Sequence, residues 1–219
     1  MSQFARYQRL LIVTFLLGIT LLISACVTPQ TKATTQVTSF NLTQQNLQAG
    51  GLALITSSTI TGQEEDKQAV AMAFSQVLAN IRPQLKVVPL AETLSAINGA
   101  DLTSEYKHML EDYRVTGIFE QKILQKIGQI TQARYIGQLK LGGFRQESKN
   151  RLGVLGLRII DTKTTDIRLF LQIWDSRNGS VAWEGSQELT SARDSFKEET
   201  VTFKSSVEEA SRQLIKNLP

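Results

Sequence analysis

The first 25 residues constrain this chain most, because they decide the compartment in which the rest of it folds. Two arginines precede an apolar run, Leu10–Ile23, and two small residues separate that run from Cys26. A basic start, an apolar stretch and small residues at its end are typical of a secretory signal peptide. The run has about 14 residues, which is short for a membrane-spanning helix. The sequence therefore predicts that residues 1–25 are a signal peptide and that the domain folds after export.

Residues Leu22–Cys26 follow the order aliphatic, aliphatic, small, small, cysteine, which resembles the lipobox of bacterial lipoproteins. The resemblance implies cleavage between Ala25 and Cys26 and attachment of lipid, palmitate included, to the cysteine. Because Val27 and not an aspartate follows, the chain resembles Gram-negative lipoproteins that are sorted to the outer membrane and face the periplasm. The alternative is an uncleaved anchor that continues to Val27, in which Cys26 is a buried thiol.

The cysteine and charge content exclude several classes of function. Cys26 is the only cysteine, so its acylation leaves no intrachain disulfide, no cysteine metal site and no cysteine nucleophile. Lys and Arg number 24 against 20 Asp and Glu, and two of the arginines lie in the signal peptide. The remaining charges are dispersed and interleaved, which indicates no nucleic-acid partner. A length of 219 residues leaves room for one ordinary domain after the cysteine.

Residues 26–48 are predicted to be the lipidated cysteine followed by a flexible tether. Within them, Thr28–Thr38 is rich in Thr and Gln and weakly charged, a composition typical of linkers. About ten such residues average roughly 17–20 Å from end to end, so we expect the domain to stay close to its membrane. Phe40, Leu42 and Leu47 are expected to hold the end of the tether against the domain.

Residues 49–219 are predicted to form a single periplasmic α/β domain, whose first half alternates strands and helices. Gly51–Thr59 is a near-continuous apolar run that predicts a buried strand. Thr61–Glu64 matches a capping box, and apolar residues recur at helical spacing from Val70 to Ile81. Pro89 places the end of the next strand at a sheet edge. The other elements expected here are a strand at 86–90 and helices at 91–97, 102–113 and 119–130.

The second half has the pattern of an antiparallel meander closed by a helix. Ile167–Trp174 alternates aliphatic residues with polar or aromatic ones, which predicts a strand with one clearly buried face. Asp175–Ser180 contains Asn-Gly and predicts a hairpin turn, after which the chain returns antiparallel. Ser195–Glu198 is a second capping-box match and predicts the start of the last helix. Further strands are expected at 135–144, where a Gly-Gly pair permits a bulge, and at 152–160.

Together, these expected strands and helices predict an α/β (α+β) fold, with a mixed sheet, a C-terminal antiparallel meander and flanking amphipathic helices. A helix that leads into Gln132–Leu139 and a hairpin over Ile173–Glu184 resemble the periplasmic α/β domain shared by three envelope families. These are the curli secretion channel lipoprotein, the amino-terminal domain of TolB and the LpoB-type activators of penicillin-binding proteins. The resemblance covers roughly residues 51–218 and implies a domain that docks other envelope proteins or assembles with itself. The chain departs from these families in lacking length for the curli channel's membrane hairpins and in lacking the activator's Pro-rich arm.

The sequence offers little for catalysis. His108 is the only histidine and lies off the apolar stripe of its helix, so a solvated residue is expected there. A histidine metal site or a Ser-His-acid triad would need that same residue. Asp161, Asp166, Asp175 and Glu184 are candidates for a catalytic carboxylate pair, but strand ends and turns are ordinary places for solubilising acids. The sequence therefore predicts no catalytic residue, no metal, no cofactor and no enzymatic activity.

Trp174 and Trp183 flank the predicted hairpin and are candidate residues for binding a protein partner. The alternative is that the two rings pack within the domain as cross-strand neighbours. The sequence favours a lipid-anchored docking module of the cell envelope, with acylated Cys26 in the membrane and a homo-oligomer as one possible assembly. A subunit of an oligomeric secretion channel and a cell-wall enzyme are the alternatives.

Overall fold

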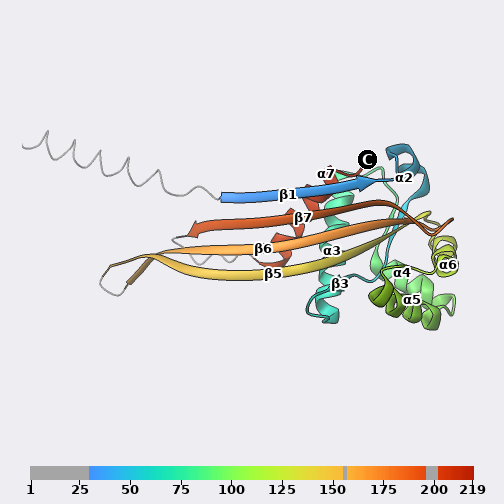
Figure 1. The fold of residues 1–219 in the computed structure, drawn as a ribbon, viewed down its shortest axis with the longest axis horizontal. Coiled ribbons are helices and arrows are strands. Elements are labelled where there is room, and N and C mark those ends of the chain that lie inside the picture. Colours follow the sequence, from blue (N-terminus) through green and yellow to red (C-terminus); the bar gives the residue numbers. More distant parts are fainter. Residues whose placement is uncertain (1–29, 155–156, 196–201) are drawn as a thin grey trace, which may run out of the picture.

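The computed structural model describes residues 30–154, 157–195 and 202–219 (Figure 1). The strands are β1 (Gln30–Ser39), β2 (Leu52–Leu54), β3 (Ser58–Thr59), β4 (Val87–Val88), β5 (Tyr135–Val154), β6 (Leu157–Asp175) and β7 (Ser180–Ser195). The helices are α2 (Gln44–Gly50), α3 (Glu64–Ile81), α4 (Leu90–Gly99), α5 (Thr103–Thr116), α6 (Gln121–Thr131) and α7 (Phe203–Lys216). Within these residues, seven strands form one mixed sheet in the order β1-β7-β6-β5-β2-β4, with β3 pairing with β5. The predicted α/β fold with an antiparallel meander is confirmed.

Helices cover the two faces of the sheet unequally. Helices α3 and α7 pack along one face, whereas α4, α5 and α6 gather at one end of the other face (Figure 1). The side chains of β5, β6 and β7 alternate between these two faces. Part of the second face therefore stays outside the helical layer.

The face under α3 and α7 holds the larger apolar core. The predicted stripe of α3 is buried in this core, through Val70, Phe74, Val77 and Leu78. The aliphatic side chains of β6 meet that stripe, because the residues that alternate from Ile167 to Ile173 are all buried. The prediction of one clearly buried face for this strand is confirmed.

The smaller core lies on the opposite face, under α4, α5 and α6. Ile136 of β5 and Trp174 of β6 contribute the sheet side of this core, and Met109, Phe119 and Ile127 contribute the helical side. The rings of Phe119 and Trp174 meet edge to face with centroids 5.2 Å apart. The second core thus anchors these helices to β2, to β4 and to the ends of β5 and β6 near the β6–β7 turn.

The segment predicted to be a flexible tether is partly a strand. Residues 30–39 form β1, which pairs antiparallel with β7 along its whole length, and residues 44–50 form α2. The prediction of a tether over 26–48 is therefore wrong from residue 30 onward. Threonine is β-branched and favours strands, and β7 supplies hydrogen-bond partners that the composition of the segment does not reveal.

The three apolar residues that follow β1 behave differently from one another. Leu42 and Leu47 are buried in the larger core, as predicted. Phe40 is 54% exposed, so its predicted role in holding the chain against the domain is wrong. The backbone makes the contact instead, because the N–H groups of Phe40 and Asn41 both donate to the carbonyl of Ala182.

Strands β5 and β6 form a hairpin much longer than the sequence predicts. At one end of the hairpin Tyr135 pairs with Asp175, and at the other end Val154 pairs with Leu157. The prediction of a separate strand at 152–160 is therefore wrong. Residues 145–151 are mostly polar, and the apolar alternation that signals a strand is missing there. The predicted bulge at the Gly-Gly pair is confirmed by a register shift between Leu141 and Gly143.

The first of the two capping boxes does not cap its helix as predicted. Helix α3 does begin at Glu64, but its N-cap is Gln63, without a side-chain cap. Thr61 instead accepts a hydrogen bond from the Gln63 backbone and donates one to Asp66. A threonine two residues before the N-cap therefore orders the approach to this helix.

The second capping box lies ahead of the helix it was expected to start. Helix α7 begins at Phe203, where Thr202 accepts a hydrogen bond from the Ser205 backbone. Ser195 ends β7, and residues 196–201 lie outside the described residues. Val207 and Leu214 of this helix are buried in the larger core.

Candidate functional site

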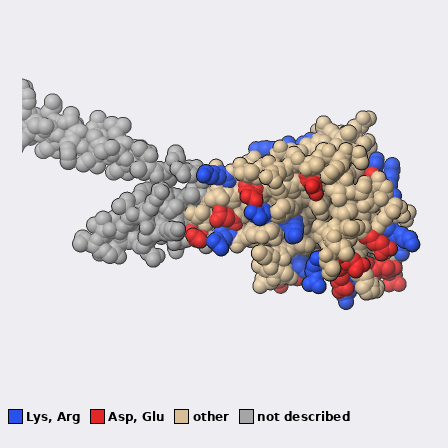
Figure 2. Space-filling model, viewed as in Figure 1, with Lys and Arg blue, Asp and Glu red and all other residues tan. Residues whose placement is uncertain are grey.

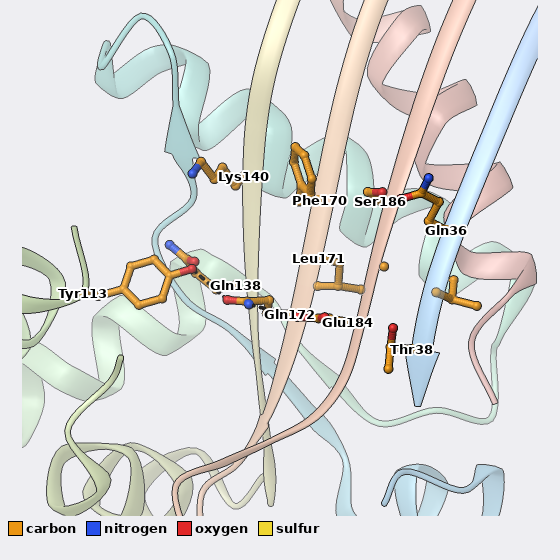
Figure 3. A pocket seen from close by; sticks show the side chains of 12 residues that line it. Gln36, Thr38, Tyr113, Gln138, Lys140, Phe170, Leu171, Gln172, Glu184 and Ser186 are labelled. Carbon is orange, nitrogen blue, oxygen red and sulfur yellow. Dashed lines mark hydrogen bonds between the residues drawn. The ribbon is translucent and has the colours of Figure 1, made fainter. Parts of the chain in front are cut away.

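The part of the sheet left uncovered by α4–α6 carries a hollow lined by side chains of four strands. We call this surface the open face and define it by Gln138 of β5, Gln172 of β6, Glu184 of β7 and Thr38 of β1. These four residues are register partners across adjacent strands, so they form one row across the sheet. The hollow has a volume of about 380 Å³, and Tyr113 of α5 stands at its side (Figure 3).

A second row of side chains lies two residues farther along each strand. It contains Lys140, Phe170, Ser186 and Gln36, again paired in register from β5 to β1. Two residues of a strand span about 7 Å, and neighbouring strands are about 4.8 Å apart. The two rows therefore form a shallow polar grid, in which Phe170 is the aromatic member (Figure 3).

Hydrogen bonds fix the orientation of the first row. The Tyr113 hydroxyl donates to Gln172 Oε1 at 2.8 Å, and Gln172 Nε2 donates to Glu184 Oε2 at 3.3 Å. Burial raises the pKa of Tyr113, and the nearby Glu184 carboxylate raises the pKa further, so the phenol stays a donor. The ring of Tyr113 is held in place by stacking on Phe119, with centroids 4.0 Å apart.

Gln138 is the most deeply buried polar side chain of the hollow, with an exposed fraction of 2%. Its Nε2 donates to Ser58 Oγ at 3.0 Å, which fixes the direction of the amide. Among the described residues, its Oε1 accepts no hydrogen bond. A buried carbonyl oxygen without a donor costs free energy, and because this oxygen is enclosed by the protein, Gln138 shapes the wall of the hollow and is not assigned a ligand contact.

Ion pairs and hydrogen bonds continue along the open face beyond the hollow. Arg168 Nε lies 2.6 Å from Glu188 Oε1, and Thr190 donates to Asp166 at 2.7 Å. Blue and red side chains are likewise interleaved over the surface shown in Figure 2, without a large area of one sign. The electrostatics of this face do not select a strongly charged ligand.

The four acids that the sequence raised as a catalytic pair are not brought together. Glu184 lies in the hollow, Asp166 bonds Thr190 farther along, and Asp175 binds Arg134 at the β6–β7 turn. The side chain of Asp161 lies outside the described residues. Among the residues that the structure does describe, none form a cluster of three potential metal ligands.

Asp175 is held by an ion pair and a backbone hydrogen bond within the fold. Arg134 Nη2 lies 2.6 Å from Asp175 Oδ2, and the backbone N–H of Arg177 donates to Oδ1 at 3.1 Å. Burial raises the pKa of Asp175, but the hydrogen bonds from Arg134 and Arg177 outweigh it and leave the pKa below its ordinary value. The pair joins the start of β5 to the end of β6.

The two tryptophans proposed as a partner-binding pair are separated by the sheet. Trp183 is buried in the larger core and Trp174 in the smaller core, on opposite faces. Their exposed fractions are 1% and 4%, so neither ring is available to a partner and this prediction is wrong. The register pairs Trp183 with Ile173 and Trp174 with Val181, because a bulge separates the two rings.

Other residues singled out by the sequence fall in different places. His108 is exposed on α5, as predicted. Ala25 and Cys26 lie outside the described residues. Across the part of the chain that is described, no helix has the length and hydropathy of a membrane span.

Sequence reasoning missed Gln138 and Tyr113 as members of a site. Gln172 and Phe170 had a signal, because they alternate with the buried aliphatic residues of β6 and so share the other face. Gln138 has the same signal for its face, because Leu139 and Leu141 beside it are buried in the larger core, but the sequence does not signal its burial, which comes with the contact to Ser58 of β3. The position of Tyr113 in its helix predicts a core residue. Only the packing of α5 shows that its hydroxyl reaches Gln172 on the sheet.

No protein-family model and no curated protein matches this chain. Among solved structures, it is similar to the PelC dodecamer from Paraburkholderia phytofirmans, with 13% identity, a TM-score of 0.44, and 85% and 94% of the two chains covered. It is also similar to the lipoprotein GNA1162 from Neisseria meningitidis, with 14% identity, a TM-score of 0.36, and coverage of 76% and 99%. A PDZ domain protein from Parabacteroides distasonis has 11% identity, a TM-score of 0.35, and coverage of 88% and 37%. These likenesses are too distant to transfer a function, so the proposals below rest on the chain's own residues.

Proposed function

We propose that this chain is a lipoprotein, anchored by Cys26 to the periplasmic face of the outer membrane, that docks another envelope protein through the edge of its sheet. The lipobox pattern supports the anchor, and lasting attachment needs more than one acyl chain, as lipoprotein acylation supplies. The observation that carries the docking role is the free outer edge of β1.

Strand β1 lacks the features that usually protect a sheet edge. It has ten residues, contains no proline and carries one charged side chain, Lys32. Within the described residues, no strand pairs with its outer side. A long regular edge of this kind is a template for adding a strand from another chain.

The pairing of β1 with β7 shows which backbone groups point outward. The N–H of Phe40 donates to Ala182 on β7, and N–H groups alternate in direction along an antiparallel strand. The N–H of Gln36 therefore points toward β7, whereas those of Thr35 and Val37 point away from the sheet. Val37 is also 45% exposed, so the edge offers an apolar contact beside its free N–H groups.

The anchor and this edge are close in sequence. Only three residues lie between Cys26 and Gln30, the first residue of β1. The four residue steps from Cys26 to Gln30 span at most about 14 Å when extended, so an acylated Cys26 would hold the start of β1 near the lipid headgroups. This supports a docking surface that works close to the membrane.

The proposed role is binding without catalysis. Among the described residues, Glu184 is the one carboxylate that lines the hollow, and its Oε2 is already bonded to Gln172. Hydrolysis of a glycosidic bond uses two carboxyl groups on either side of the bond in most enzymes. The arrangement of this face thus favours recognition over the cell-wall enzyme alternative.

The second candidate function is an oligomeric channel-type subunit, and one observation favours it. Beyond Leu141, no strand other than β6 pairs with β5 among the described residues. The outer edges of β1 and β5 lie on opposite sides of the sheet. Pairing of β1 with β5 of another copy would be head-to-tail, which generates a ring or a filament.

The test is site-specific crosslinking in cells with a photoreactive residue at Val37. The docking role predicts a crosslink to one distinct envelope protein, and the same residue at Met72 of α3 is the control because Met72 is also exposed, at 62%. A ladder of self-crosslinks from both Val37 and Arg145 would select the ring instead. Equal products from Val37 and Met72, or none from Val37, would contradict docking at this edge.

A further inference from the structure

We propose that the hollow of the open face binds an uncharged oligosaccharide that lies across strands β5, β6, β7 and β1. The inference goes beyond docking at the β1 edge, because it uses side chains of the open face and not the outward backbone groups of β1. It rests on the side chains of the two rows, on their hydrogen-bond capacity and on their charge.

The first row presents donors and acceptors that point in fixed directions. Gln172 has two amide hydrogens and donates one to Glu184, so the other is free for a ligand. Glu184 keeps its second carboxylate oxygen as an acceptor. A ligand must therefore supply both donors and acceptors within a short distance.

Vicinal hydroxyl groups satisfy this requirement. Each hydroxyl donates one hydrogen bond and accepts two, so adjacent hydroxyls can bridge neighbouring amide and carboxylate groups. A purely apolar ligand would instead leave the Glu184 carboxylate and the second amide hydrogen of Gln172 desolvated without partners. The hydrogen-bond pattern thus selects a polyhydroxylated molecule.

The second row supplies a surface for the apolar side of a sugar ring. Phe170 lies in the middle of this row between Lys140 and Ser186, and it is half-buried, so part of its ring faces the hollow (Figure 3). The C–H face of a pyranose packs on an aromatic ring and gains apolar burial. Strand spacing of about 4.8 Å is similar to the length that one sugar unit adds to an extended chain, so successive units can meet successive strands.

The charge of the hollow argues against charged polymers. Among the described residues, the lining holds one cation, Lys140, and one anion, Glu184. A nucleic acid or another polyanion would need several Lys or Arg side chains, and a polycation would need several carboxylates. A peptide in extended form would be expected at the strand edge, where backbone groups are free, and not across this face.

The experiment is calorimetry on the full-length lipoprotein, kept in a zwitterionic detergent because detergents with sugar headgroups would compete. The probes are two uncharged hexasaccharides, one of β-1,4-linked glucose and one of N-acetylglucosamine, and a charged hexamer of galacturonate. We expect at least one uncharged hexamer to bind and the galacturonate to bind more weakly. Phe170→Ala should weaken that binding by about tenfold, the effect of one lost aromatic contact.

Matched variants separate recognition from folding. Phe170→Tyr keeps the ring and should retain the affinity, Gln172→Ala should lose it, and Met72→Ala on the opposite side of the molecule should change nothing. Unaltered thermal unfolding of Phe170→Ala shows that the variant is folded. Absence of binding by both uncharged hexamers, preference for galacturonate, or equal binding by Phe170→Ala would each overturn the proposal.

Discussion

At the scale of single residues, polar groups of this chain act in two different ways. The carboxylate of Asp175 has its hydrogen bonds satisfied within the protein, because each of its oxygens accepts from Arg134 or Arg177. Gln172 differs, because its amide accepts from Tyr113 and donates one hydrogen to Glu184, which leaves the second amide hydrogen for a ligand. The first arrangement stabilises a turn, whereas the second leaves capacity for a ligand.

Asp175→Asn should lower the free energy of unfolding by about 2 kcal/mol at pH 7, because it removes the charge from a mostly buried ion pair. The folded pKa of Asp175 lies below its ordinary value of 3.8, so its stabilising effect is fully present above that pH. The effect is lost as pH falls through the lower folded pKa. Urea unfolding at pH 7 and near pH 3 checks this.

The difference between the original protein and Asp175→Asn should therefore shrink in acid. A difference that stays constant down to pH 3 would show that the charge of Asp175 does not contribute. Asp166→Asn is the matched control, because Asp166 is exposed and bonds a surface threonine, Thr190.

Gly185→Ala should destabilise the fold by about 1–3 kcal/mol through overpacking. A Cβ at this position would come within 3.0 Å of Leu214 Cδ1 and would also meet the ring of Trp183. Gly143→Ala is the control, since nothing lies within 4 Å of a Cβ there. Thermal unfolding that is equally lowered in both variants would contradict close packing of α7 on β7.

At the scale of elements, β1 decides how this domain meets its surroundings. It extends the meander by one strand and at the same time leaves that strand's outer edge without a partner in the described residues. Its alternate residues also complete the rows of the open face, through Thr38 and Gln36. One strand therefore contributes to both proposed binding surfaces, by its backbone on one side and by its side chains on the other.

Proline substitutions in β1 should separate edge docking from folding. Val37→Pro removes an N–H that points outward, so it should cost little stability and abolish the partner crosslink of the edge. Gln36→Pro removes an N–H that bonds to β7 and should cost more, about 2 kcal/mol. Urea unfolding measures both, and a crosslink from Thr35 that survives Val37→Pro would contradict docking by strand addition.

At the scale of the whole molecule, the start of β1 lies at the end of the sheet opposite α4–α6 (Figure 1). Gln30 pairs with Ala192 near the end of β7, whereas Ser39 pairs with Trp183 near the β6–β7 turn. An anchor at Cys26 would therefore turn the long β5–β6 hairpin toward the membrane and the helical end away from it. The open face would lie along the side of the molecule.

Cys26→Ser should prevent lipid attachment and cleavage of the signal peptide, since the implied lipoprotein processing needs the cysteine. The expected result is a precursor that is heavier by the signal peptide and no longer labelled by palmitate. Mass spectrometry and metabolic labelling in cells check the result. Normal maturation of the variant would contradict the anchor, and Ser24→Ala serves as a control that keeps the small residue.

The sequence predicted the elements that have a strong local signal. The stripe of α3, the alternation of Ile167–Trp174 and the Asn-Gly turn each place apolar or turn-forming residues at a fixed period, and all three are confirmed. It did not predict β1 or the outer half of the β5–β6 hairpin. Those segments are polar, and their strand structure depends on pairing with distant partners.

The sequence by itself determined the export pattern, the single cysteine, the fold class and which face of each amphipathic element is buried, because these follow from local order and periodicity. Only the tertiary structure decided that the two tryptophans lie on opposite faces and that Gln138, Gln172, Glu184 and Thr38 form one row. Register and bulges between strands set those neighbours, and a shift of one residue would reverse every face.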